Sequence, residues 1–167
     1  SISELKNLDH SKLKEVAKKL KKISDIIIFD SAAGLGEEAV AAIESADELV
    51  IVTNPEIPAV TDALKISKLI EQMGKSVKGV IVTKVKNSKT EMPISNISEM
   101  LELPILGVVP HDDKFQASLV MKDAIVHTYP RSKASREYKR IAASLIGHNS
   151  YKEKVSCMNF IFVAKKH

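Results

Sequence analysis

Four short apolar runs divide the chain, and each predicts a β-strand. They lie at residues 26–29, 49–53, 79–82 and 105–109. None of these runs alternates apolar with polar residues, so both faces of each strand are expected to be covered, as in a parallel sheet between two helical layers.

Helices are predicted before, between and after these strands. Before the first strand, Leu13, Val16, Ala17 and Leu20 recur at helical spacing after a cap at Asp9 or Ser11. The other predicted helices cover residues 37–46, 58–73, 94–101 and 132–146. Strands that alternate with helices predict an α/β fold, a doubly wound and mostly parallel sheet flanked by helices.

The last twenty residues break this alternation, so the predicted organisation is an α/β domain at residues 1–147 and a tail at residues 148–167. The tail has an apolar cluster at residues 158–163 between lysines. An edge strand, a docked tail and a membrane-surface segment all fit this pattern, and the sequence leaves them open.

Composition narrows the classes of function. The 167 residues favour one domain, and a formal net charge of +4 does not point to nucleic acid as a partner. The single cysteine, Cys157, fits a reducing compartment, and no apolar run reaches the length of a membrane span. We therefore expect a cytoplasmic protein, with a peripheral contact at the inner face of the cell membrane left open.

The first strand runs into Asp30 and then into a turn of small residues, DSAAGLG at positions 30–36. Ligands of open α/β sheets bind at the carboxyl ends of the strands. A carboxylate there suits a water-mediated contact to Mg²⁺ beside a phosphate, and Gly34 and Gly36 permit positive φ angles. The alternative is that Asp30 caps the next turn and the glycines only shape a loop.

Two further strands end in polar turns. The second strand closes on the sequence TNPE at positions 53–56, and the fourth is stopped by Pro110, followed by His111, Asp112 and Asp113. The last three residues suit either a turn with a helix cap or a ligand contact.

These three motifs, in this order, resemble those of the MinD/ParA family of deviant P-loop ATPases, in particular its MinD branch. DSAAG resembles the family's D-S-P-A-G turn, TNPE its T-N-P-E turn, and LGVVPHD at positions 106–112 its G-V-I-P-x-D segment. The resemblance covers about residues 9–147 and implies a P-loop NTPase-like fold with ATP and Mg²⁺ as ligands.

The resemblance also implies roles for single residues. Asp30 matches the Walker-B aspartate, a catalytic residue that reaches Mg²⁺ through water. Residues 31–34 match the switch-II turn, and residues 110–112 match the loop against the adenine. The cofactor-binding positions implied in this way are Ser31, Ala32, Gly34, Asn54, Pro110, His111 and Asp112.

Two departures from the family pattern concern the nucleotide. No G-x-x-x-x-G-K-[ST] motif occurs in the chain, and Thr83-Lys84 stands where members often have an Asn-Arg pair that reads the base. We therefore expect weak ATP binding or hydrolysis by this chain alone. We also expect a fold that is incomplete at the amino terminus, with a gap at the centre of the sheet where the family's P-loop strand lies.

The function implied is that of a MinD-like ATPase in spatial organisation, such as division-site placement. It would form a homodimer through the switch face and act with a regulatory protein partner. The alternative is a non-catalytic interaction module derived from such an ATPase. A phosphoacceptor domain is disfavoured, because no acidic pair precedes Asp30.

Overall fold

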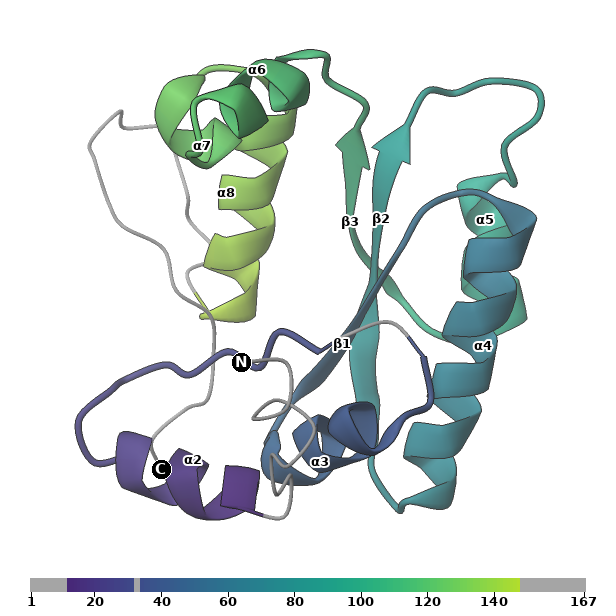
Figure 1. Ribbon diagram of the computed structural model, residues 1–167. Helices are drawn as coiled ribbons and strands as arrows, with labels where there is room; N and C mark the ends of the chain where they lie inside the picture. The colour runs from purple at the N-terminus through teal and green to yellow at the C-terminus, as the bar shows by residue number, and fades with distance from the viewer. Residues whose placement is uncertain (1–11, 32–33, 148–167) are drawn as a thin grey trace. The chain divides into compact units, whose positions relative to one another are not determined.

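The computed structural model describes residues 12–31 and 34–147, which fall into two units that meet between Leu49 and Val50 (Figure 1). Each unit is described by itself. The predicted tail at residues 148–167 lies outside the described residues.

The first unit contains two helices, α2 (Leu13–Leu20) and α3 (Glu37–Ser45), which contact each other. An ion pair between Lys21 and Asp47, at 2.6 Å, fastens the end of α2 to the residues that follow α3. Both helices match predicted ones. The predicted apolar face of α2 is only partly buried, since Ala17 is buried whereas Val16 is 48% exposed.

The predicted strand at residues 26–29 is wrong. Residues 26–30 carry no regular secondary structure, although Ile27 is buried. An apolar run becomes a strand only when a neighbouring strand pairs with its amides and carbonyls. No strand within the described ranges pairs with this run.

The second unit is built on a sheet of three strands in the described residues, in the order β1 (Leu49–Thr53), β2 (Val77–Val85) and β3 (Ile105–Pro110). β2 and β3 are parallel. The connections are α4 (Ile57–Gln72) and α5 (Ile94–Leu101), and both helices lie on the same side of the sheet (Figure 1). That placement follows from right-handed crossovers between strands that are neighbours in sequence and in space.

The core of this unit lies between the sheet and these two helices. Val80 and Val82 project from β2 onto the same face, and with Val60 of α4 and Ile97 of α5 they have no exposed surface. The buried members of the cluster are Ile51, Val60, Ala63, Val80, Val82, Val85, Ile97 and Leu101.

The other face of β3 is covered by α8 (Lys133–Leu145), which is reached through α6 (Lys114–Val120) and α7 (Ile125–Thr128). Gly107 makes this packing close, because a Cβ atom at this position would lie 2.3 Å from Cγ1 of Ile141. Helices on both faces make the sheet doubly wound, as predicted. α6 and α7 were not predicted.

The carboxylate of Glu137, on α8, lies against the edge of β3. Its Oε1 accepts a hydrogen bond from the amide of Val108 at 3.4 Å, and Arg140 donates to the same carboxylate. The hydrogen bond from Arg140 is the main reason why the pKa of Glu137 is lowered. The amide of Val108 is thus bonded to an ionised side chain, where a further strand would otherwise pair with β3.

Candidate functional site

The carboxyl ends of the three strands are joined to one another by hydrogen bonds. The hydroxyl of Thr83, near the end of β2, donates to the carbonyl of Thr53 at 3.1 Å. The amide of His111, just after β3, donates to the carbonyl of Val85 at 2.9 Å. Asn54 and His111 therefore lie at one edge of the sheet, where ligands of open α/β folds bind.

Asn54 shapes the turn after β1. Its Oδ1 accepts a hydrogen bond from the amide of Glu56 at 3.3 Å, which is an Asx turn. The next carbonyl, that of Pro55, accepts from the amide of Met92 at 2.8 Å. The turn is thus held both locally and by the loop that precedes α5.

The end of β2 and the loop that follows it contain two backbone features that the sequence analysis missed. Lys84 and Asn87 have φ angles of 58°, in the left-handed region, and the register of β2 on β3 shifts between Val82 and Val85. The carboxylate of Glu91 accepts from the amides of Lys86 and Ser88 at 3.0–3.2 Å. The predicted strand at residues 79–82 is therefore too short, because β2 continues to Val85 through a bulge.

Asp112 joins the end of β3 to two helices. Its Oδ1 accepts from the amide of Lys114 at 3.1 Å, and its Oδ2 accepts from the amide of Ala134 at 3.5 Å. Burial by itself raises the pKa of Asp112, but the hydrogen bonds from Lys114, Ser132 and Ala134 outweigh it and lower the pKa. The sequence left open a turn with a helix cap or a ligand contact. The hydrogen bonds of Asp112 are those of a turn and cap.

His111 and Pro110 complete this loop. Pro110 ends β3 and is half-buried, whereas His111 is exposed and its Nε2 lies 3.1 Å from Oδ1 of Asp113. The three residues that resemble an adenine loop are thus consecutive at the strand end, and their backbone is fixed on both sides.

We expect the stability of the second unit to fall at acid pH, because Asp112 and Glu137 both have lowered pKa values in the folded state. Such a carboxylate stabilises the fold above its unfolded pKa, about 4, and this contribution is lost as the pH falls through the folded value. Urea unfolding at about pH 6 and about pH 3 measures the loss.

The double variant Asp112→Asn/Glu137→Gln is expected to be less stable than the wild type at about pH 6, and its stability should depend less on pH over this range. Glu99→Gln, an exposed acid on α5, is the control and should keep the wild-type dependence. Equal slopes for all three proteins would contradict the prediction.

The turn after residue 30 belongs to the first unit. Asp30 and Ser31 are exposed, and Ala32 and Ala33 lie outside the described residues. Gly34 has a φ of 117°, in the region that glycine permits, whereas Gly36 has a φ of −70° and serves as the N-cap of α3.

The geometry around Asp30 suits Mg²⁺. That ion keeps several waters and is bound by one or two carboxylates together with the phosphates of a substrate. Asp30 is a single exposed carboxylate, and no atom lies within 4 Å of a Cβ built at Gly34, so the turn leaves open space. Over residues 12–31 and 34–147, no group of three or more His, Cys, Asp or Glu side chains could enclose a metal.

No helix in the described part of the chain has the length and apolar character needed to cross a bilayer.

One protein-family model matches most of the chain. The family model described as "4Fe-4S iron sulfur cluster binding proteins, NifH/frxC family" matches residues 13–156. Iron–sulfur clusters are usually held by several cysteines, whereas this chain has a single one, Cys157. The match therefore concerns the fold and the family and gives no support for a cluster on this chain.

An uncharacterized ATP-binding protein of Methanocaldococcus jannaschii is 39% identical over 147 residues, which are 88% of this chain and 56% of that protein. The septum site-determining protein MinD of Pyrococcus horikoshii, solved with Mg-ADP, matches with a TM-score of 0.77 and 30% identity over 88% of this chain and 60% of that one. MinD of Aquifex aeolicus, solved in a MinC:MinD complex, matches with a TM-score of 0.77 and 26% identity over 91% of this chain and 63% of that one.

The chain therefore spans little more than half the length of the relatives that it matches. Its parallel sheet flanked by helices is the fold of those MinD structures. The chain belongs to the MinD/ParA-type P-loop ATPase family.

Proposed function

We propose that the chain forms the switch and base side of a MinD-type ATP site and acts in the placement of the division site. The observation that carries this proposal is the connected edge of β1, β2 and β3, because Asn54 and residues 110–112 lie on it together. The MinD of Pyrococcus horikoshii that matches this chain was solved with Mg-ADP, which supports the choice of ligand.

In this proposal Asp30 would hold Mg²⁺ through water, and Ser31, Ala32 and Gly34 would follow the terminal phosphate. The ion would neutralise charge on the phosphates. Asn54 would fix the turn beside the nucleotide, and residues 110–112 would lie along the base. Asp112 acts through the backbone that it positions, since its oxygens accept hydrogen bonds from protein donors.

Assembly belongs to the same proposal. A homodimer through the switch face, with a regulatory protein as a further partner, is supported by the similar Aquifex aeolicus structure, which is a complex of MinC with MinD. A cytoplasmic location with peripheral attachment to the inner face of the membrane would suit such a role.

A non-catalytic interaction module is the second candidate. It is supported by Thr83-Lys84, which stands at the position where the base would be read. Such a module would keep the dimer and partner surfaces without hydrolysis.

Calorimetric titration with MgATP separates the two candidates. Under the ATP-site proposal we expect micromolar affinity that falls at least about tenfold in Asp30→Ala, equivalent to about 1.4 kcal/mol. Asp25→Ala, which removes another exposed carboxylate of the same unit, is the matched control and should bind as the wild type does.

The titration is run on this chain and on the longest protein that its gene encodes. Absence of binding by both, with circular dichroism showing folded protein, would contradict the ATP-site proposal and support the interaction module. Equal affinities of wild type and Asp30→Ala would contradict the role of Asp30.

A further inference from the structure

Lys84 has a backbone conformation that lysine rarely adopts. Its φ angle is 58°, in the left-handed region, where glycine or asparagine is usual. The register of β2 on β3 shifts at the same place, between Val82 and Val85. Backbone strain of this kind is found mainly at sites where it positions a group for function. The conformation of Lys84 therefore points to a function for its side chain.

The bulge keeps this side chain out of the core. Val82 belongs to the core cluster, and the next side chain on that face of a regular strand would be that of residue 84. Val85 takes that place instead, and Lys84 is exposed. In the register Val85 pairs with Pro110. Lys84 thus carries its charge at the edge of the sheet, one residue from the start of the loop at residues 110–112.

The oxygens along this edge already accept hydrogen bonds from the protein. The carbonyls of Thr53, Pro55 and Val85 each accept one, at 2.8–3.1 Å. So do Oδ1 of Asn54 and both carboxylate oxygens of Asp112. An amino group of a bound base would have to share an oxygen that is already hydrogen-bonded.

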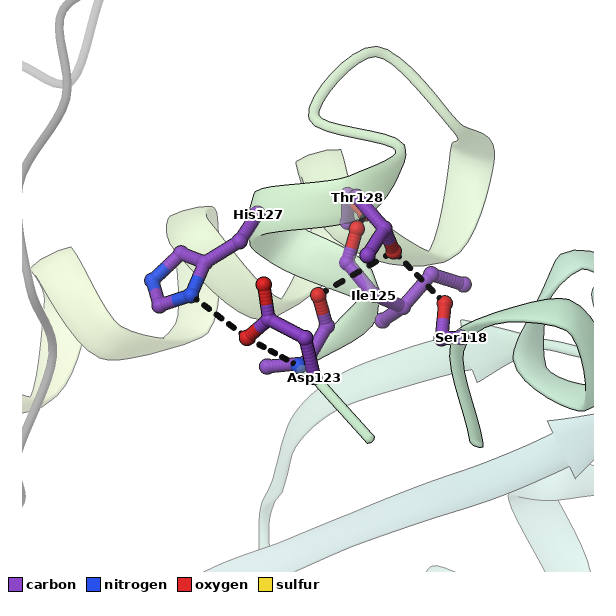
Figure 2. Close-up of polar contacts among 7 residues, drawn as sticks. Ser118, Asp123, Ile125, His127 and Thr128 are labelled. Carbon is purple, nitrogen blue, oxygen red and sulfur yellow. Dashed lines mark hydrogen bonds and ion pairs between the residues drawn. The ribbon is translucent and has the colours of Figure 1, made fainter. Parts of the chain in front are cut away.

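The position of Asp112 is fixed from the far side of the loop. The amide of Lys114, to which Asp112 is bonded, begins α6. The carbonyl of Lys114 accepts from the hydroxyl of Ser118 at 3.0 Å, and that hydroxyl lies 2.7 Å from the hydroxyl of Thr128 on α7 (Figure 2). Asp112 is thus held to a helix that is itself tied to its neighbour, so its oxygens cannot turn toward a ligand without breaking these contacts.

The two acids that follow the loop are paired as well. Oδ1 of Asp113 lies 3.1 Å from Nε2 of His111. Oδ1 of Asp123 lies 3.0 Å from Nδ1 of His127 and accepts from the amide of Ala124 at 2.7 Å (Figure 2). The carboxylates of this segment, which are the strongest acceptors, are therefore engaged within the protein.

The ammonium group of Lys84, in contrast, makes no hydrogen bond or ion pair with any residue that the structure describes. Such a group only donates hydrogen bonds. Adenine and guanine both offer N7 as an acceptor, but guanine adds the acceptor O6 where adenine has the donor N6. A free donor beside engaged acceptors suits guanine at least as well as adenine.

We propose that Lys84 contacts the base and that the site accepts guanine nucleotides at least as well as adenine nucleotides. Lys84 would donate to N7 of either purine and also to O6 of guanine. This inference rests on the ATP-site proposal above, which places residues 110–112 along the base. Lys84 is then a specificity-determining residue, and the ligands are the purine nucleoside triphosphates as a class.

Calorimetric titration with MgATP, MgGTP and MgITP tests the selectivity, on this chain and on the longest protein that its gene encodes. We expect the Kd of MgGTP to be equal to that of MgATP or lower. MgITP has the same carbonyl at carbon 6 as MgGTP but lacks the 2-amino group. It should bind as MgGTP does, because O6 is the atom that Lys84 contacts.

Two substitutions test the role of Lys84. K84N supplies an acceptor for N6 of adenine, and asparagine suits the positive φ, so the ratio of the affinities should shift toward MgATP by at least about tenfold. K84A should weaken MgGTP at least about fivefold and MgATP less, because guanine loses two contacts and adenine one. K89A removes an exposed lysine of the loop that follows, and it should bind all three nucleotides as the wild type does.

The possible failures can be told apart. Tighter binding of MgATP than of MgGTP by the wild type, beyond the error of the titration, would overturn this inference and leave the ATP-site proposal standing. Equal affinities of K84A and wild type for MgGTP would overturn the contact of Lys84 with the base. If neither protein binds any of the three nucleotides while circular dichroism shows both to be folded, this inference fails together with the ATP-site proposal.

Discussion

Gly107→Val is expected to destabilise the second unit by about 2–3 kcal/mol, in the range measured for overpacked cores. Gly107 lies on β3 beneath α8, and a Cβ there would meet Cγ1 of Ile141 at 2.3 Å and its Cδ1 at 2.4 Å. Both atoms lie under 3.0 Å, so Ile141 must leave its rotamer or α8 must move. Urea unfolding followed by circular dichroism measures the loss.

A double-mutant cycle with Ile141→Ala tests this explanation. Ile141 is 1% exposed, and its truncation should be costly in the wild type but much less costly in the Gly107→Val background, because it removes the clash. Ser144→Ala, an exposed change on α8, should leave stability nearly unaltered. Additive effects of the two core substitutions would contradict the clash.

Ile97→Ala is expected to cost about 3–4 kcal/mol, because it removes three buried carbons and leaves a cavity between the sheet and the helices. Ile97 has no exposed surface and packs in the cluster that contains Val80 and Leu101. A loss of this size is a large part of the stability of a domain, and the variant should unfold at clearly lower urea concentration.

The same substitution at Ile57 is the matched control. Ile57 begins α4 and is 64% exposed, so Ile57→Ala should change the free energy of unfolding by less than about 0.5 kcal/mol. If the two variants unfold alike, the core does not lie where the structure places it.

The sequence predicted those parts of the fold in which local pattern and packing agree. α5 has the predicted bounds, and α4 and α8 differ from the predictions by only a residue at each end. Their apolar positions recur at helical spacing, and they end near proline or glycine, so the local signal is complete. Ser132, which was predicted to be the first residue of this helix, is its N-cap, and its Oγ accepts a hydrogen bond from the amide of Ser135.

Other features could not be predicted because they depend on what lies beside a segment. Residues 26–29 have the apolar pattern of a strand and lack a partner strand among the described residues. α6 was missed because only its first turn follows the usual helical signal, with Phe115 packed against Tyr138. Further along the helix Ser118 is buried, whereas Leu119 and Val120 are exposed. The bulge at Lys84 has no sequence signature, since glycine or asparagine would be expected at a positive φ.

The candidate site shows the same division. Strand-end turns at Asn54 and at residues 110–112 were predicted, because proline and polar residues stop apolar runs. The contributions of Thr83 and Glu91 were missed, because each depends on a contact that the sequence does not show. Thr83 bonds to the carbonyl of Thr53 on another strand, and Glu91 accepts from the amide of Lys86 earlier in its own loop. The functional roles of Asp30, Ser31 and Gly34 stay predictions.

The carboxylate of Glu137 has a consequence for how this sheet can grow. By accepting the hydrogen bond of Val108, it blocks one flank of the ladder against any incoming strand, whether from another protein or from an aggregate. Within the described residues β1 is the other outermost strand of the sheet. A wider sheet containing this chain would therefore gain its additional strands beside β1.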